Sequence, residues 1–117
     1  MTKAIIYHNP RCSKSRETLK LLEQHNIKHD IHLYLNNPLN KQSLKQLLAE
    51  LKLPVRDIIR SGENEYKDLG LDSENLTDDQ LLDAIVATPK LMQRPIVSYQ
   101  GKARIGRPPE QVLDLFK

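Results

Sequence analysis

Several residue types are scarce in this chain of 117 residues, and their scarcity limits both its core and the class of protein it belongs to. Tryptophan is absent and aromatic residues make up 4%, so a core must be built mainly from leucine, isoleucine and valine. No apolar run is long enough to predict a transmembrane helix. The only cysteine, Cys12, cannot close a disulfide within the chain, which argues against a disulfide-stapled secreted domain. The chain also begins with no signal-peptide layout, so we expect a cytoplasmic protein.

The basic excess of the chain is small. Its net charge is +3, and it contains neither a polybasic run nor an aromatic platform of the kind that stacks on bases. We therefore expect no nucleic-acid partner, and a small anionic substrate accounts for the charge equally well. The length predicts a single domain over residues 1–117.

Hydrophobic patterning predicts β structure at both ends of the chain and helices between them. Residues 3–8 and 29–35 have strand character and flank a helical pattern at 15–24, which predicts a parallel βαβ unit. Residues 95–99 and 102–105 predict an antiparallel hairpin, because Gln100-Gly101 is a two-residue link. A helix at 110–116 follows. The predicted fold is α/β and thioredoxin-like, with a mixed four-stranded sheet, helices on both faces, and a helical insertion at about 40–90.

The insertion contains several shorter helical signals. Leucines at helical spacing over residues 44–51 predict a helix that Pro54 stops, and short helical turns are expected at 55–60 and 65–69. Thr77-Asp78-Asp79-Gln80 has the pattern of a capping box that opens a further helix.

Cys12 is the main candidate for chemistry. It lies where the first strand gives way to the first helix, and free backbone N–H groups at such a junction favour a thiolate. The alternative is a small buried hydrophobe, but the neighbours of Cys12 are polar and charged. Ser15, one helical turn later, is expected to donate a hydrogen bond to the thiolate or to serve as the helix N-cap. His8 is either a group that supports the thiolate or a solvated histidine at the end of a strand.

Spacing excludes two familiar cysteine chemistries. Ser15 stands where a Cys-x-x-Cys oxidoreductase has its second thiol, and Thr18 stands where a phosphatase loop has its arginine. The remaining histidines form no pattern of zinc ligands, so no metal is expected.

Three arginines beside chain breakers are candidates for holding an oxyanion. Arg60, Arg94 and Arg107 precede Ser61-Gly62, Pro95 and Pro108-Pro109 respectively. Taken singly, each is a typical surface arginine, but guanidinium groups that converge match a tetrahedral anion. In a thioredoxin-like domain the strand facing the active cysteine usually begins with a cis-proline. We therefore predict a cis Arg94–Pro95 bond that brings Arg94 beside Cys12.

These residues resemble those of the glutaredoxin-dependent arsenate reductase family (ArsC-type, thioredoxin-like), and most closely its short YfgD-like branch. The resemblance rests on segments spread over nearly the whole chain: residues 6–16, 33–35, 69–71, 77–81, 94–97 and 106–110. It implies that Cys12 is the nucleophile, with His8 and Ser15 supporting it. It further implies that Arg60, Arg94 and Arg107 bind the oxyanion.

The resemblance also implies a reaction. Arsenate would be reduced to arsenite through a covalent adduct with the Cys12 thiol, with glutathione and glutaredoxin as electron donors and no bound cofactor. Two alternatives remain open. One is a monothiol oxidoreductase acting on another oxyanion or on glutathione mixed disulfides, and the other is an Spx-like transcriptional regulator. Such regulators usually carry a Cys-x-x-Cys switch, which Ser15 removes here.

Overall fold

The computed structural model describes residues 3–117, and Met1 and Thr2 lie outside the described residues. The chain divides into two compact units. The sheet unit comprises the chain up to Asn37 together with Arg94–Lys117, and the helical unit comprises Pro38–Gln93. The single domain expected from the chain length stays a prediction. No helix within residues 3–117 has the length and apolar character needed to span a bilayer.

The sheet unit contains a four-stranded mixed sheet in the order β2-β1-β3-β4. Its strands are β1 (Ala4–Tyr7), β2 (His29–His32), β3 (Ile96–Tyr99) and β4 (Lys102–Ile105). β1 runs parallel to β2 and antiparallel to β3, and β3 pairs with β4 as an antiparallel hairpin. This arrangement confirms the predicted α/β, thioredoxin-like fold class.

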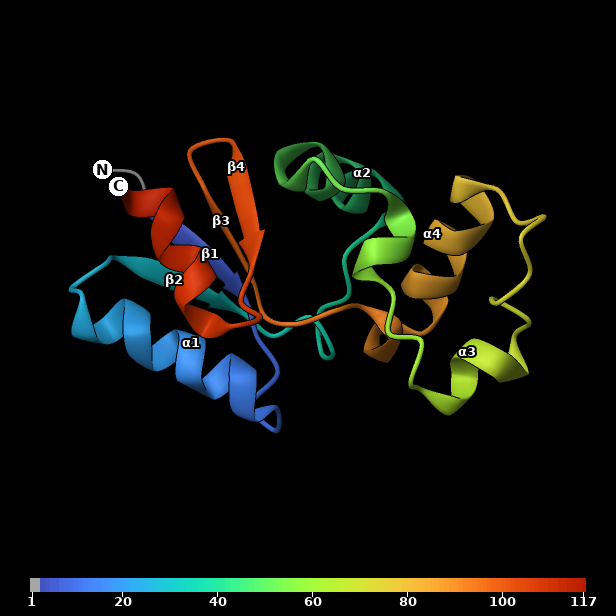
Figure 1. Cartoon of the computed structure of the whole chain (residues 1–117), viewed down its shortest axis with the longest axis horizontal. Coiled ribbons are helices and arrows are strands. Elements are labelled where there is room, and N and C mark those ends of the chain that lie inside the picture. Colours follow the sequence, from blue (N-terminus) through green and yellow to red (C-terminus); the bar gives the residue numbers. More distant parts are fainter. Residues whose placement is uncertain (1–2) are drawn as a thin grey trace. The chain divides into compact units, whose positions relative to one another are not determined.

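The two helices described in the sheet unit pack on one face of the sheet, and helices on both faces stay a prediction (Figure 1). α1 (Ser13–Gln24) and the 3₁₀ helix η3 (Pro109–Phe116) contact each other there. Leu22 of α1 and Val112 of η3 are fully buried against residues of β1 and β3. The apolar cluster consists of Ala4, Ile6, Leu22, Val97 and Val112, with Leu19, Ile27, Tyr99, Leu115 and Phe116 around it. As the absence of tryptophan implies, this core is built from aliphatic side chains.

Most elements differ from their predicted bounds by one to three residues, and two of these differences lie beside the candidate site. β2 ends at His32 instead of reaching residue 35, because the backbone N–H groups of Asn36 and Asn37 both donate to Leu33 O and close a turn. α1 begins at Ser13, so its N-cap is Cys12 itself and the N-cap alternative for Ser15 is wrong.

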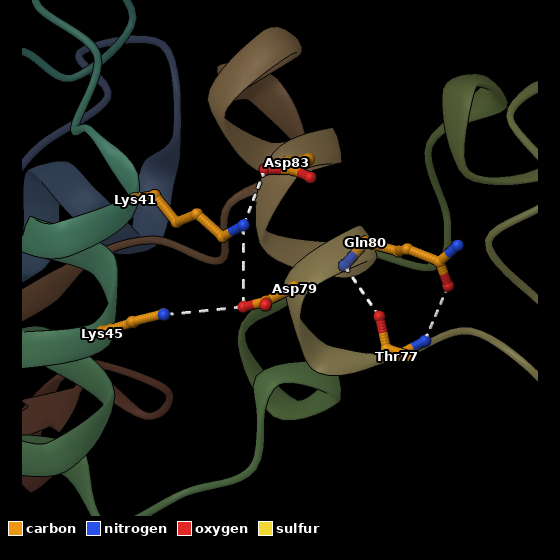
Figure 2. Close-up of polar contacts among 6 residues, drawn as sticks. All are labelled: Lys41, Lys45, Thr77, Asp79, Gln80 and Asp83. Atoms are coloured by element: carbon orange, nitrogen blue, oxygen red, sulfur yellow. Dashed lines mark hydrogen bonds and ion pairs between the residues drawn. The ribbon is translucent and has the colours of Figure 1, made fainter.

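The helical unit contains α2 (Lys41–Leu51), η1 (Val55–Ile58), α3 (Asn64–Asp68), α4 (Asp78–Ala87) and η2 (Pro89–Leu91). The predicted capping box is confirmed: Thr77 Oγ1 accepts from Gln80 N–H, and Gln80 Oε1 accepts from Thr77 N–H. Figure 2 shows this pair beside the ion pairs that join α2 to α4. Lys41 Nζ lies 3.1 Å from an oxygen of Asp83 and 3.6 Å from one of Asp79, which also pairs with Lys45.

Candidate functional site

Cys12 occupies the junction between β1 and α1. Its backbone N–H donates to Asn9 O at 3.0 Å, and its own carbonyl accepts from Arg16 N–H in the first turn of the helix. The residue is 8% exposed. The thiol therefore lies beside the free backbone N–H groups at the N-terminus of a twelve-residue helix, where negative charge is favoured.

The surroundings of the sulfur favour the thiolate. Burial, the largest single influence, acts to raise the pKa of Cys12, but several groups together outweigh it. The backbone N–H groups of Ser15 and Lys14 and the charge and hydrogen bond of Arg94 lower the pKa of Cys12 below its ordinary value. These surroundings favour the thiolate, which is the reactive form of a cysteine, and the nucleophilic role of Cys12 stays a prediction.

Two of the three candidate arginines meet at this sulfur. Arg107 Nη2 lies 3.6 Å from Cys12 Sγ, and Arg107 Nε donates to the carbonyl of Arg94 at 2.8 Å. The Arg94–Pro95 peptide is cis, as predicted, and the Arg107–Pro108 peptide is cis as well. The two guanidinium groups come from loops that precede β3 and follow β4, so the hairpin carries both to the N-terminus of α1.

Gly106 allows this close approach. A Cβ built at Gly106 would lie 2.6 Å from Thr18 Oγ1 and 2.7 Å from Pro95 Cγ. Gly106 N–H also donates to Pro95 O at 2.9 Å, which ties the Arg107 loop to the Arg94 loop. The sequence marks Gly106 only as a chain breaker, because the clash depends on residues distant in the chain.

His8 and Ser15 form a buried pair behind the thiol. Ser15 Oγ lies 2.7 Å from His8 Nδ1 and accepts from Asn9 N–H at 3.0 Å. Burial lowers the pKa of His8 and the charge of Arg16 lowers it further, and both effects favour the neutral imidazole. The hydroxyl of Ser15 is thus engaged with His8 and Asn9, and it is the backbone N–H of Ser15 that reaches Cys12. His8 is thus hydrogen-bonded to the first turn of α1 through Ser15, and the catalytic roles of both residues stay predictions.

We expect Ser15→Ala to destabilise the fold by about 1–3 kcal/mol, because His8 Nδ1 and Asn9 N–H would lose their partner in a buried place. Urea denaturation measures the change. Ser13→Ala is the matched control, since Ser13 is exposed at the start of the same helix and should change stability by less than about 0.5 kcal/mol. Equal stabilities of the two variants would show that the buried pair contributes nothing.

The rate at which iodoacetamide alkylates Cys12 should follow the thiolate fraction as pH is raised. Because the pKa of Cys12 is lowered, we expect the midpoint of this profile below that of free cysteine. The lowered pKa also makes the thiolate a stabilising group, and this stabilisation is complete above the unfolded-state pKa and lost as pH falls through the folded-state pKa. A midpoint at or above that of free cysteine would show that the surroundings of Cys12 do not lower its pKa.

Arg60 belongs to the helical unit, so its approach to Cys12 stays a prediction. Its backbone N–H donates to Leu91 O at 2.7 Å, beside the bridge between Ile59 and Met92. Its Nε lies 3.4 Å from Glu63 Oε1. Its Nη1 is buried with no hydrogen-bond partner among residues 3–117, which leaves a donor available to a bound anion.

Comparison with known proteins agrees with this geometry. A family model described as "ArsC family" matches residues 7–115. The chain belongs to the ArsC family. YfgD of Escherichia coli (strain K12) is 50% identical over 117 residues, covering 98% of each chain. A protein named arsenate reductase from Neisseria meningitidis serogroup A is 45% identical, covering 96% of this chain and 97% of the relative.

Solved structures of ArsC proteins share the fold. A structure titled as an arsenate reductase from Vibrio cholerae is 48% identical and superposes with a TM-score of 0.95, covering 97% of this chain and 98% of its own. These similarities confirm the resemblance to ArsC proteins and to YfgD that the sequence motifs indicate.

Proposed function

We propose that this ArsC protein is an arsenate reductase that depends on glutathione and glutaredoxin. The observation that carries the proposal is the convergence of Arg94 and Arg107 on Cys12 Sγ. Together with the amides of residues 14 and 15, they surround the sulfur with donors that suit a tetrahedral oxyanion. Relatives of nearly the same length that are 45% and 46% identical carry the name arsenate reductase.

In the first step the Cys12 thiolate attacks the arsenic atom of bound arsenate. A sulfur–arsenic bond forms while one arsenate oxygen takes up protons and leaves as water, and arsenic stays As(V). The guanidinium groups of Arg94 and Arg107, with Arg60 as the expected third, hold the charged oxygens throughout. The hydrogen bonds of Ser15 Oγ with His8 and Asn9 keep the Cys12 loop in the shape that presents the backbone amides.

In the second step the thiol of glutathione attacks the Cys12 sulfur. A disulfide between Cys12 and glutathione forms and the sulfur–arsenic bond breaks. The bonding pair leaves with arsenic, so As(V) becomes As(III) and arsenite is released. A glutaredoxin thiolate then takes the glutathione and returns Cys12 to its thiolate. Because the chain has one cysteine, both resolving thiols come from outside. The scheme uses no bound cofactor or metal, and the donors suit a cytoplasmic protein.

Arsenate-dependent oxidation of NADPH, coupled through glutathione reductase, tests the donor requirement. We expect turnover with glutathione and glutaredoxin together, and a fall to background when either is omitted. Full turnover without glutaredoxin would overturn the glutaredoxin dependence. Turnover with glutathione mixed disulfides and none with arsenate would favour the alternative of a monothiol oxidoreductase.

A further inference from the structure

A cavity of about 350 Å³ lies beside the Cys12 loop, within the sheet unit. The chain from His8 to Arg11 forms one wall, and Leu33, Leu35 and Asn36 of the turn after β2 form the other. Its size falls at the lower end of the range for small-molecule sites, and its wall combines apolar groups with side-chain amides. None of the steps assigned to Arg94 and Arg107 uses this cavity.

Arg11 stands out among the basic side chains that surround Cys12. Lys14 Nζ is paired with Glu17 at 3.6 Å, and Arg16 Nη1 donates to Pro10 O at 3.1 Å. The Arg11 guanidinium has neither an ion pair nor a hydrogen bond to any residue in the described chain 3–117, although its backbone N–H is held by Asn9 Oδ1. An exposed guanidinium that lines a cavity and has no internal partner is suited to an external anion.

We propose that this cavity binds the thiol co-substrate, a small carboxylate-bearing thiol peptide of the glutathione type, through an ion pair between Arg11 and one of its carboxylates. Leu33 and Leu35 contact its apolar atoms, and the side-chain amides of Asn9 and Asn36 bond to its peptide groups. The proposal rests on the proposed function, because it assigns a place to the second reactant of that scheme.

The distances along the chain allow the thiol to reach the sulfur. Arg11 is bonded to Cys12, so their Cα atoms are about 3.8 Å apart. An extended tripeptide spans about 10 Å, enough to place a carboxylate at Arg11 and its own sulfur at Cys12. The arsenate oxygens and the carboxylate then use different arginines, so both reactants can be bound together.

Reaction with glutathione disulfide tests the cavity without arsenate. The Cys12 thiolate attacks one sulfur of the disulfide, a Cys12–glutathione bond forms, and the other glutathione leaves as a thiolate. Mass spectrometry follows the rate of this modification, and uncharged hydroxyethyl disulfide serves as the reference reagent. We expect Arg11→Gln to slow the reaction with glutathione disulfide by about tenfold or more and to leave the reaction with hydroxyethyl disulfide within about twofold.

Lys20→Gln is the matched control, because it removes the same charge from an exposed side chain of α1 that does not line the cavity. We expect the ratio of the two rates in Lys20→Gln to stay near that of the wild type, while Arg11→Lys recovers part of the loss. If Arg11→Gln leaves the ratio unchanged, or if Lys20→Gln lowers it equally, the cavity proposal is overturned. A protein that reduces no arsenate but shows the Arg11-dependent ratio would refute the proposed function and support the cavity.

Discussion

Replacing Cys12 by serine should reduce arsenate-dependent turnover by at least about a thousandfold while the protein stays folded. A serine hydroxyl is not ionised at neutral pH, so the amides and arginines around position 12 would have no thiolate to present. A hydroxyl also cannot form the disulfide that reduces As(V), so the electron transfer itself is lost. The coupled NADPH assay measures the change.

The fold of the Cys12→Ser variant needs its own check. Cys12 is an N-cap with a small side chain, and serine is a favoured N-cap residue, so we expect the melting temperature to change by only a few degrees. Turnover above a tenth of the wild-type rate in a correctly folded Cys12→Ser protein would rule out Cys12 as the nucleophile.

Replacing Arg94 by alanine should lower kcat/KM for arsenate by about 10²–10³-fold. Arg94 contributes both charge and a hydrogen bond at the Cys12 sulfur, so its removal weakens oxyanion binding and raises the pKa of Cys12. The same variant should therefore shift the iodoacetamide profile to higher pH. Steady-state kinetics and the alkylation profile together separate the two effects.

Arg104→Ala is the matched control for Arg94→Ala. Arg104 is an exposed arginine on β4 in the same sheet, so its removal changes the net charge equally without touching the site. We expect near-wild-type kinetics from Arg104→Ala and a stability loss of about 1 kcal/mol from Arg94→Ala. If Arg94→Ala lost stability in proportion to activity, or if Arg104→Ala lost the same activity, Arg94 would have a structural or general electrostatic role.

The sequence predicts those parts of the fold that depend on local patterns. The apolar alternation at the chain ends predicts the strands correctly. The Gln100-Gly101 link predicts the hairpin correctly, because a two-residue hairpin turn needs positive φ, and φ is +50° at Gln100 and +80° at Gly101. The capping box at Thr77 is also predicted correctly, because it depends on only four consecutive residues. β2 is shorter than predicted because the apolar alternation of Ile31, Leu33 and Leu35 continues into the turn that Leu33 O closes.

The site is predicted less completely, because its contacts join distant parts of the chain. Cys12 and Arg94 could be proposed from their neighbours, and the cis bond at Pro95 follows from the thioredoxin-like pattern. The contact of Arg107 with Cys12 spans 95 positions, and no local signal shows that Ser15 turns its hydroxyl to His8. The first contact depends on how the hairpin is placed beside α1, and the second depends on the conformation of the loop between β1 and α1.

Measuring the arsenic species formed shows directly whether the Cys12 site reduces arsenate. Arsenate, glutathione and glutaredoxin would be incubated with the wild-type protein or with Cys12→Ser, and arsenite would be separated from arsenate by chromatography and quantified. We expect arsenite in amounts equal to the NADPH consumed by the wild type, and none above background with Cys12→Ser. NADPH consumption without arsenite, or arsenite formed equally well by Cys12→Ser, would contradict this expectation.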